Sequence, residues 1–533
     1  MKNREINFRK AGLRPLVCAT AMFLLFSSSF AQNFSGGNGM QNNPYIITTA
    51  AELAQLATYV NAGDTNYNDK HYKLANNINL SAYGAGFNNG KGWIPIGKYD
   101  HVSGTYNCPF KGVFDGDSNV ITGLYINDAN LDHAGLFGYI TKNSNTSGVS
   151  YLRVDSANIT GGSFVGGITG RTYGGCHLLN CSSSGNIVGS MYVGGLAGHI
   201  DYDFIFNCYS SCDVSGQGMI GGVLGMAANE CIIVNCYSTG DVSGGGMVGG
   251  IVGSLSLRSD MMNCYSTGNI TGGNYVGGIA GLANGASIKN CYATGNIIGN
   301  KCVGGIVGEA SGILGCSDGY IIDNVALNPS VNGDNYVGRI MGYNISGATI
   351  NNNTAYDSML NKAGNTTWND KGATKIDGAD ISKETINTDG TLGGRFIVQV
   401  WTTQNGKLPG LFGKTVDMPL HLRMSGEVGV VGIDNSNIKI YPNPTKGQLT
   451  IESTELKIEM VEILDILGKC VYTTSLRGTK CRSNPENNNE YSGLLRYARN
   501  YEVVIDVSHL ASGAYFVSVY SEGQKITRKF VKE

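Results

Sequence analysis

The amino-acid sequence predicts an all-β protein in which a parallel β-helix-like solenoid is followed by a smaller β-rich domain. Three observations support this class: glycine doublets recur every 27 or 28 residues, short β-branched runs separate them, and the repeats stop before the C-terminal hundred residues. A period held to within one residue indicates units that stack on copies of themselves. The doublets begin at Gly166, Gly194, Gly221, Gly249, Gly277 and Gly304.

The composition excludes other repeat folds. Glycine accounts for 78 of 533 residues, and an interior glycine costs about 1 kcal/mol in a helix, which argues against helical repeats. A leucine-rich repeat has a similar period but needs several leucines per unit, whereas most units here have one or none. In a parallel β-helix, glycines at the bends would supply positive φ angles, and each turn would hold about three short strands.

The N-terminus has the pattern of a secretory signal peptide. Basic residues precede an apolar run at residues 16–26, and small residues lead to a cleavage site between Ala31 and Gln32. The apolar run is too short to span a bilayer. We therefore expect an exported chain with no transmembrane segment in its mature form. The net charge of -2 argues against nucleic acid as a partner.

Changes in sequence character divide the chain into segments. After the signal peptide (1–31), residues 32–134 are expected to form a leader and cap, in which a helical stretch at 50–60 covers the open end of the stack. The repeats occupy residues 135–350 and a closing segment occupies residues 351–412. Residues 413–437 are expected to be a linker, and residues 438–533 the last domain.

Four successive repeats contain the sequence N-C-Y, and equivalent residues of stacked parallel strands would form columns about 4.8 Å apart. The asparagines are expected to form a hydrogen-bonded amide ladder. We interpret the cysteines as small buried residues, because in-register side chains point the same way and zinc-site spacings are lacking. These structural ladders comprise Asn207, Asn235, Asn263, Asn290, Cys208, Cys236, Cys264 and Cys291. Cys470 and Cys481 are a candidate disulfide.

The tyrosines that follow the cysteines form the candidate ligand-facing ladder. If the cysteines point inward, alternation directs the next residue outward, and a column of exposed tyrosines would offer a platform for stacking sugars. Aromatic columns also stabilise solenoids, so a structural role stays open. The residues concerned are Tyr209, Tyr237, Tyr265 and Tyr292.

Catalytic groups are sparse. Acidic residues of the repeats are out of phase, and the nearest constellation is His199, Asp201 and Asp203 in one turn, which we interpret as a polar surface bend. The sequence contains no H-E-x-x-H, G-x-S-x-G or P-loop motif. We therefore expect no enzyme activity and no catalytic, cofactor or metal site. A β-helix enzyme acting on polysaccharide remains an alternative.

The signature G-[ILV]-x-G, as at 195–198, 250–253 and 278–281, resembles the GLUG repeat of bacterial surface proteins. The segments 43–47 and 93–97 resemble the leader of that family, and 401–411 resembles its closing strand. The resemblance covers about residues 36–412. GLUG repeats occur in adhesin-like proteins and also beside peptidase domains. The resemblance therefore implies a surface protein but does not identify its ligand.

The C-terminal segment resembles the type A sorting domain of the type IX secretion system of Bacteroidetes. The motifs Tyr441–Gly447 and Asp506–Gly513 occur in order with their flanking strands. This resemblance implies a small Ig-like β-sandwich, contact with the type IX secretion machinery, and delivery to the outer-membrane surface or the medium.

Together these features predict an exported, surface-displayed or secreted β-solenoid that acts as a binding or adhesin-like protein. Its expected ligand is a glycan or a host glycoprotein. A purely structural surface or matrix protein is the first alternative, and a polysaccharide-active enzyme is the second.

Overall fold

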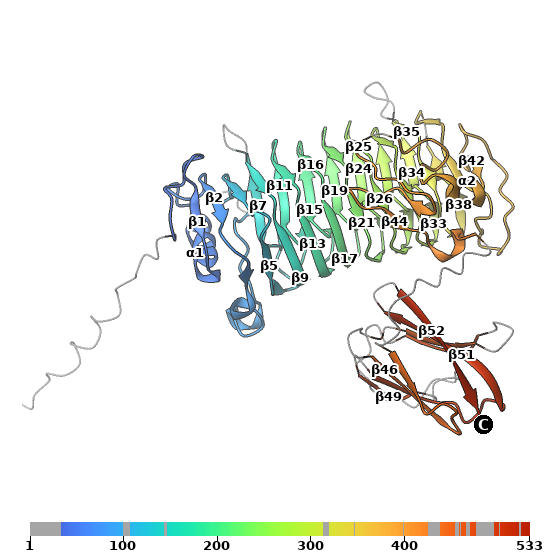
Figure 1. The fold of residues 1–533 in the computed structure, drawn as a ribbon. Coiled ribbons are helices and arrows are strands. Elements are labelled where there is room, and N and C mark those ends of the chain that lie inside the picture. Colours follow the sequence, from blue (N-terminus) through green and yellow to red (C-terminus); the bar gives the residue numbers. More distant parts are fainter. Residues whose placement is uncertain are drawn as a thin grey trace, which may run out of the picture. The chain divides into compact units, whose positions relative to one another are not determined.

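The chain divides into two compact units, Met1–Met424 and Ser425–Glu533, drawn in Figure 1. The computed structural model describes residues 34–99, 107–142, 147–312, 319–345, 347–397 and 399–424 of the first unit, and 438–453, 458, 460–464, 470–475, 495–499, 502–521 and 524–533 of the second. The predicted signal peptide, with its expected cleavage site between Ala31 and Gln32, lies outside these residues. So does Cys481, and with it the candidate disulfide to Cys470.

The first unit confirms the predicted parallel β-solenoid, with coils stacked along one axis (Figure 1). A coil passes in turn through four parallel sheets, named here sheets 1 to 4 in chain order, instead of the three strands expected. In one coil these strands are β17 (Tyr209–Gly216), β18 (Met219–Gly221), β19 (Leu224–Ala228) and β20 (Ile232–Val234). The extra corner falls within V-G-G-[ILV]-x-G, since sheet 2 ends at the first glycine of the doublet and sheet 3 begins three residues later.

The strands of the four sheets have the following bounds. Sheet 1 contains β3 (Ile78–Asn79), β5 (Val120–Thr122), β6 (Tyr125–Asn127), β9 (Arg153–Thr160), β13 (Ser182–Val188), β17, β21 (Tyr237–Ser238), β22 (Val242–Gly244), β26 (Tyr265–Ser266), β27 (Ile270–Thr271), β31 (Tyr292–Ala293), β32 (Ile297–Ile298), β36 (Val325–Ala326), β37 (Val331–Asn332), β41 (Thr354–Tyr356) and β42 (Ala379–Ile381). Sheet 2 contains β10 (Val165–Gly166), β14 (Tyr192–Gly194), β18, β23 (Met247–Gly249), β28 (Asn274–Gly277), β33 (Lys301–Gly304) and β38 (Asn335–Gly338). Sheet 3 contains β7 (Phe137–Thr141), β11 (Thr169–Tyr173), β15 (Ala197–Asp201), β19, β24 (Val252–Ser256), β29 (Ala280–Asn284), β34 (Val307–Ser311) and β39 (Met341–Asn344). Sheet 4 contains β1 (Tyr45–Ile47), β2 (His71–Leu74), β4 (Val113–Asp115), β8 (Gly148–Ser150), β12 (His177–Leu179), β16 (Phe204–Phe206), β20, β25 (Asp260–Met262), β30 (Ser287–Lys289), β35 (Tyr320–Ile322) and β40 (Thr349–Asn351).

Neighbouring coils are in register, so that Tyr237 pairs with Tyr265 and Gly249 with Gly277. Strand alternation directs one set of side chains into a continuous apolar core. In sheet 4 the inward column contains Ile205, Ile233, Met261, Ile288 and Ile321, all fully buried. Because each coil buries its apolar residues against the next, the stack forms one core along its whole length.

The N-terminal end of the stack is covered by α1 (Ala50–Asn61), at the blue end of Figure 1. A capping box starts this helix: the Thr49 hydroxyl accepts from the backbone N–H of Glu52, and the Glu52 carboxylate accepts from the backbone N–H of Thr49. The helix buries Leu53, Leu56 and Val60 in the solenoid core. Two short 3-10 turns follow in the same cap, η1 (Ser81–Tyr83) and η2 (Asn88–Gly90).

The asparagines form a ladder at the corner between sheets 4 and 1. Each side-chain amide donates to the carbonyl oxygen of the asparagine one coil earlier, at 3.0 Å from Asn235 to Asn207, 3.2 Å from Asn263 to Asn235 and 2.7 Å from Asn290 to Asn263. Their φ angles lie between 53° and 56°. Asparagine tolerates this left-handed conformation better than most residues, so the same side chain turns the corner and links the coils.

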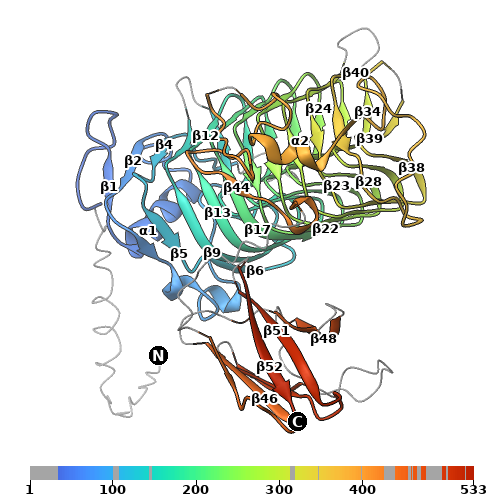
Figure 2. The same cartoon turned by 45° about the vertical axis from the view of Figure 1, so that its right-hand side comes forward.

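The C-terminal part of the first unit folds back along sheet 1. It contains α2 (Lys383–Thr388), β43 (Lys407–Leu408), β44 (Val416–Asp417) and η3 (Leu420–Leu422), and Figure 2 shows α2 and β44 in orange against the stack. We call residues 383–424 the strap. Residues 413–424, expected to be linker, belong to it: Leu422 is fully buried, and the Tyr356 hydroxyl donates to the His421 carbonyl at 3.3 Å.

The second unit is a sandwich of two antiparallel sheets. One has the order β45 (Ile438–Tyr441), β46 (Gln448–Ser453), β50 (Glu502–Asp506), β49 (Leu495–Arg499). The other has the order β48 (Cys470–Ser475), β47 (Met460–Leu464), β51 (Gly513–Ser521), β52 (Gln524–Lys532). Their apolar faces share one core, with Leu449 and Ile505 from the first sheet and Ile463, Val517 and Phe530 from the second.

Candidate binding site

The tyrosine column lies on the outer face of sheet 1, as the alternation predicts. The rings of Tyr209, Tyr237, Tyr265 and Tyr292 stack in sequence, with centroids 4.8, 4.7 and 5.0 Å apart and planes inclined by 5°. In such a stack each inner ring covers the face of its neighbour. The column therefore presents mainly ring edges and hydroxyl groups, which offer a poor surface for stacking a sugar.

The strap covers part of this column, so the expectation of four exposed tyrosines is wrong. Tyr265 is 5% exposed and Tyr292 is fully buried. The Trp401 ring lies 6.2 and 6.0 Å from their rings, and the Tyr292 hydroxyl donates to the Pro409 carbonyl at 2.6 Å. Tyr237 remains partly exposed, although burial raises its pKa to about 12. The column mainly anchors the strap.

The cysteine column lies at the inner side of the same corner, and its thiols are free and buried. The thiol of Cys236 donates to the Val234 carbonyl at 3.3 Å, and that of Cys264 to the Met262 carbonyl at 3.3 Å. Burial raises the pKa of both thiols well above its usual range. Since the thiolate is the reactive species, these side chains are chemically inert while the coils remain stacked.

We expect iodoacetamide at pH 8 to leave Cys208, Cys236 and Cys264 unmodified in the native protein and to modify them fully after denaturation. Peptide mapping by mass spectrometry measures this directly. Cys108 is free and partly exposed, so it should react in the native protein and serves as an internal control. Disulfide-linked peptides from this column would contradict the expectation.

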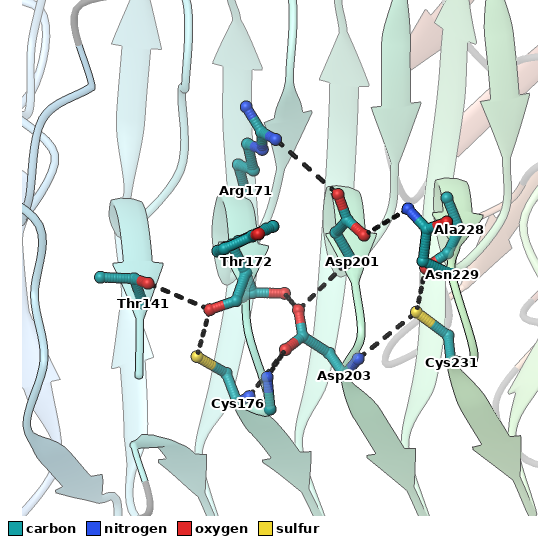
Figure 3. A network of polar contacts seen from close by, with 11 residues as sticks. Thr141, Arg171, Thr172, Cys176, Asp201, Asp203, Ala228, Asn229 and Cys231 are labelled. Atoms are coloured by element: carbon teal, nitrogen blue, oxygen red, sulfur yellow. Dashed lines mark hydrogen bonds and ion pairs between the residues drawn. The ribbon is translucent and has the colours of Figure 1, made fainter. Parts of the chain in front are cut away.

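The constellation His199, Asp201 and Asp203 is not a surface bend, because these side chains are only 9%, 8% and 1% exposed. Figure 3 shows the polar contacts around Asp201 and Asp203. The Asp201 carboxylate accepts from the Asn229 amide at 2.8 Å and lies 3.9 Å from the Arg171 guanidinium. The corner between sheets 3 and 4 thus depends on buried polar groups that link successive coils.

Asp203 is the centre of this network. Its carboxyl group accepts from the Thr172 hydroxyl at 2.5 Å and from the backbone N–H groups of Gly175, Cys176 and Asp201 at 2.9, 2.6 and 3.1 Å. Burial raises its pKa to about 6, because desolvation outweighs these hydrogen bonds. A carboxyl group enclosed by its own chain in this way has a structural role.

A different surface emerges at the corner between sheets 2 and 3. The residue before each V-G-G segment and the residue seven positions later form two adjacent outward rows, which we call the edge rows. The first row contains Phe164, Tyr192, Met219, Met247, Tyr275, Cys302 and Tyr336. The second contains Arg171, His199, Met226, Ser254, Leu282, Glu309 and Tyr343.

Contacts across the two rows recur along the stack. The Tyr192 and His199 rings are 5.5 Å apart, and the Arg171 guanidinium carbon lies 5.7 Å from the centre of the Phe164 ring. At the far end the Tyr336 and Tyr343 rings are 4.5 Å apart. Most members are partly exposed, and these last two are 51% and 36% exposed. The edge rows therefore form a mainly apolar surface over the coils of Phe164 to Leu282, which the buried Cys302 and Glu309 separate from the exposed Tyr336 and Tyr343.

Sequence reasoning missed the edge rows although their signal is present. The positions flanking V-G-G-x-x-G hold aromatic, Met, Leu or charged residues in nearly every repeat. Two residues seven positions apart can lie side by side on the surface only if the backbone turns a corner within the glycine segment between them. The three-strand turn expected from the sequence did not include that corner.

Comparison with known proteins identifies two regions of the chain. Residues 244–271 and 272–298 match the GLUG motif, and residues 439–533 match the secretion system C-terminal sorting domain. A "Putative Gly-rich membrane protein" of Evansella cellulosilytica is 33% identical over 176 residues, which is 32% of this chain and 18% of that protein. "Halomucin" of Haloquadratum walsbyi is 32% identical over 135 residues, 25% of this chain and 1% of that protein. The chain thus matches under a fifth of the length of these curated relatives.

Among solved structures, a "putative immunoglobulin A1 protease from Bacteroides ovatus" is 20% identical, with a TM-score of 0.43 and coverage of 72% of this chain and 96% of that chain. Within the part of the chain that the structure describes, no helix is long and apolar enough to cross a membrane. The repeats and the C-terminal match agree with the two units of the fold. The chain thus contains GLUG repeats and carries a secretion system C-terminal sorting domain, which indicates export by type IX secretion to the cell surface or the medium.

Proposed function

We propose that this exported protein is a non-catalytic binding protein, and that the edge rows contact its ligand. The observation that carries the proposal is the row of partly exposed aromatic, Met and Leu side chains that runs from Phe164 to Leu282 at one corner of the stack. Aromatic and Met residues are enriched where proteins bind partners, because they offer large apolar contact areas and adapt in shape. Equivalent side chains recur about every 4.8 Å, which suits an elongated ligand.

The proposed ligand is a glycan chain or the glycan of a host glycoprotein. An extended peptide would ordinarily join a sheet edge through main-chain hydrogen bonds. The inner strands of sheets 2 and 3 are paired on both sides with neighbouring coils, as β18 is with β14 and β23. Recognition at this surface therefore depends on side chains, and aromatic rings among polar groups suit sugars with their apolar ring faces and hydroxyl edges.

The absence of catalysis is part of the same proposal. Acid–base work on a glycosidic bond requires two carboxyl groups that reach the substrate. The clustered acids Asp201 and Asp203 are instead buried within the corner network, where chain donors occupy their oxygens. A structural role in a surface layer is the competing function, supported by the side-chain ladders and the anchored strap.

The test is binding of the purified full-length protein to an array of polysaccharides and glycoproteins. We expect selective binding that weakens about tenfold or more in the Tyr192→Ala/Tyr275→Ala variant, since losing about 1.4 kcal/mol of contact is a tenfold change. Tyr320→Ala is the matched control, because this tyrosine is 36% exposed on sheet 4. A blank array with folded protein would favour the structural role, and turnover of a polysaccharide would establish an enzyme.

A further inference from the structure

The C-terminal end of the edge rows differs from the rest in how its rings are arranged. Phe164 and Tyr192 stack with planes 20° apart, whereas the Tyr336 and Tyr343 rings are tilted by 44° at 4.5 Å. With exposures of 51% and 36%, these two tyrosines leave ring surface open to solvent. They form a tilted aromatic pair on the last coil of sheets 2 and 3.

A carboxyl group lies in the adjacent coil. Glu309 is the register partner of Tyr343 and is only 7% exposed. Within the described part of the chain, the side-chain carboxyl group of Glu309 accepts one hydrogen bond, from the Cys302 thiol at 3.4 Å. A thiol is a weak donor. A carboxylate offers about four acceptor positions, and a buried group of this kind ordinarily uses more than one. Glu309 therefore retains unused acceptor capacity beside the tyrosine pair.

The charges around this pair are balanced. The Lys301 ammonium lies 5.7 Å from the centre of the Tyr336 ring, and it also attracts the Glu309 carboxylate. Burial nevertheless raises the pKa of Glu309, since desolvation outweighs Lys301 and the thiol. An anionic ligand would meet Glu309 and a cationic ligand would meet Lys301. A neutral ligand with an apolar ring face and hydroxyl donors fits both groups.

We propose that Tyr336, Tyr343 and Glu309 bind a neutral sugar ring, with Lys301 at the rim. The ring face packs on the tyrosine pair, and its hydroxyls donate to the Glu309 carboxyl oxygens. This inference rests on the proposed function, because it assigns one subsite and one ligand class to the edge rows. It extends that function by predicting selection for neutral over charged saccharides.

The experiment is calorimetric titration of the full-length protein with three oligosaccharide sets: neutral glucans and mannans, uronic-acid oligomers, and chitosan oligomers. We expect a neutral oligosaccharide to bind, and binding to weaken about tenfold or more in Tyr336→Ala and in Glu309→Gln. Glu309→Gln keeps the side-chain size but replaces one acceptor oxygen by a donor. Tyr320→Ala is again the matched control, because a lysine ammonium also lies over its ring, at 5.4 Å.

The outcomes separate the two proposals. If Tyr192→Ala/Tyr275→Ala loses glycan binding while Tyr336→Ala and Glu309→Gln bind like the wild type, the subsite is wrong and the proposed function stands. Binding of uronic-acid or chitosan oligomers in preference to neutral ones overturns the ligand class. If the wild type binds no saccharide, both proposals fail. Unchanged thermal unfolding of Glu309→Gln separates a binding defect from a folding defect.

Discussion

Replacing Gly250 by alanine is expected to lower the free energy of unfolding by about 3 kcal/mol. A Cβ atom at this position would lie 2.1 Å from the carbonyl oxygen of Gly278 and 2.3 Å from the Ser266 hydroxyl. The hydroxyl can rotate away, but the carbonyl belongs to the next coil and can move only if the coils separate. The same close approach recurs at Gly222 and Gly278, which explains why the doublets keep their period.

Gly86→Ala is the matched control for this substitution. A Cβ atom there meets no heavy atom within 4 Å, so we expect its effect to stay within about 0.5 kcal/mol. Urea-induced unfolding of the purified full-length protein, followed by circular dichroism, measures both variants. Equal unfolding free energies for the two variants would show that the glycine corner can accommodate a methyl group without separating the coils.

The period of the sequence predicts which residues become neighbours, because each repeat places equivalent residues in one column. The asparagine and cysteine positions could be located in this way. Asn324 shows the limit of the method: its repeat is longer, and it occupies the cysteine column, where it accepts from the Cys291 backbone N–H at 3.0 Å. Asp323, with a φ of 59°, takes the outer corner instead.

The period cannot predict contacts made by segments outside the repeats. The strap reaches the tyrosine column through single contacts, such as the one from Tyr292 to Pro409, 117 residues later. Nothing in the spacing of either segment indicates that pairing. The edge rows were missed for a different physical reason, since whether two flanking residues share a surface depends on where the backbone bends.

Replacing Asp203 by alanine is expected to cost about 3 to 5 kcal/mol of unfolding free energy. Four donors would lose their acceptor, and each buried donor left unsatisfied costs about 1–3 kcal/mol, reduced where a donor can turn to another partner. At 1% exposure, Asp203 lies too deep for bulk water to replace the carboxyl group. Asp213→Ala is the control, because Asp213 is exposed and accepts one backbone N–H, from Asp241. A loss in Asp203→Ala no larger than in Asp213→Ala would contradict the network.

The same carboxyl group predicts how stability depends on pH. Its pKa is about 6 in the folded protein and about 3.9 in an unfolded chain. Between these values the folded state holds a proton that the unfolded state releases, so the unfolding free energy falls as pH rises from about 4 to about 6. The complete fall is about 3 kcal/mol, of which about 2 kcal/mol lies between pH 4.5 and 7. Cys176 and Cys231 stay protonated, because burial raises the pKa of both thiols, to about 12 for Cys231. Burial lowers the pKa of His199 to about 3, so this side chain makes the unfolding free energy rise over the same pH range. Asp203→Asn cannot ionise, so the Asp203 contribution is measured as a difference: in urea unfolding at pH 4.5 and 7, the unfolding free energy of the wild type should fall by about 2 kcal/mol relative to that of the variant. Equal pH dependence in both would place the pKa of Asp203 near its usual value.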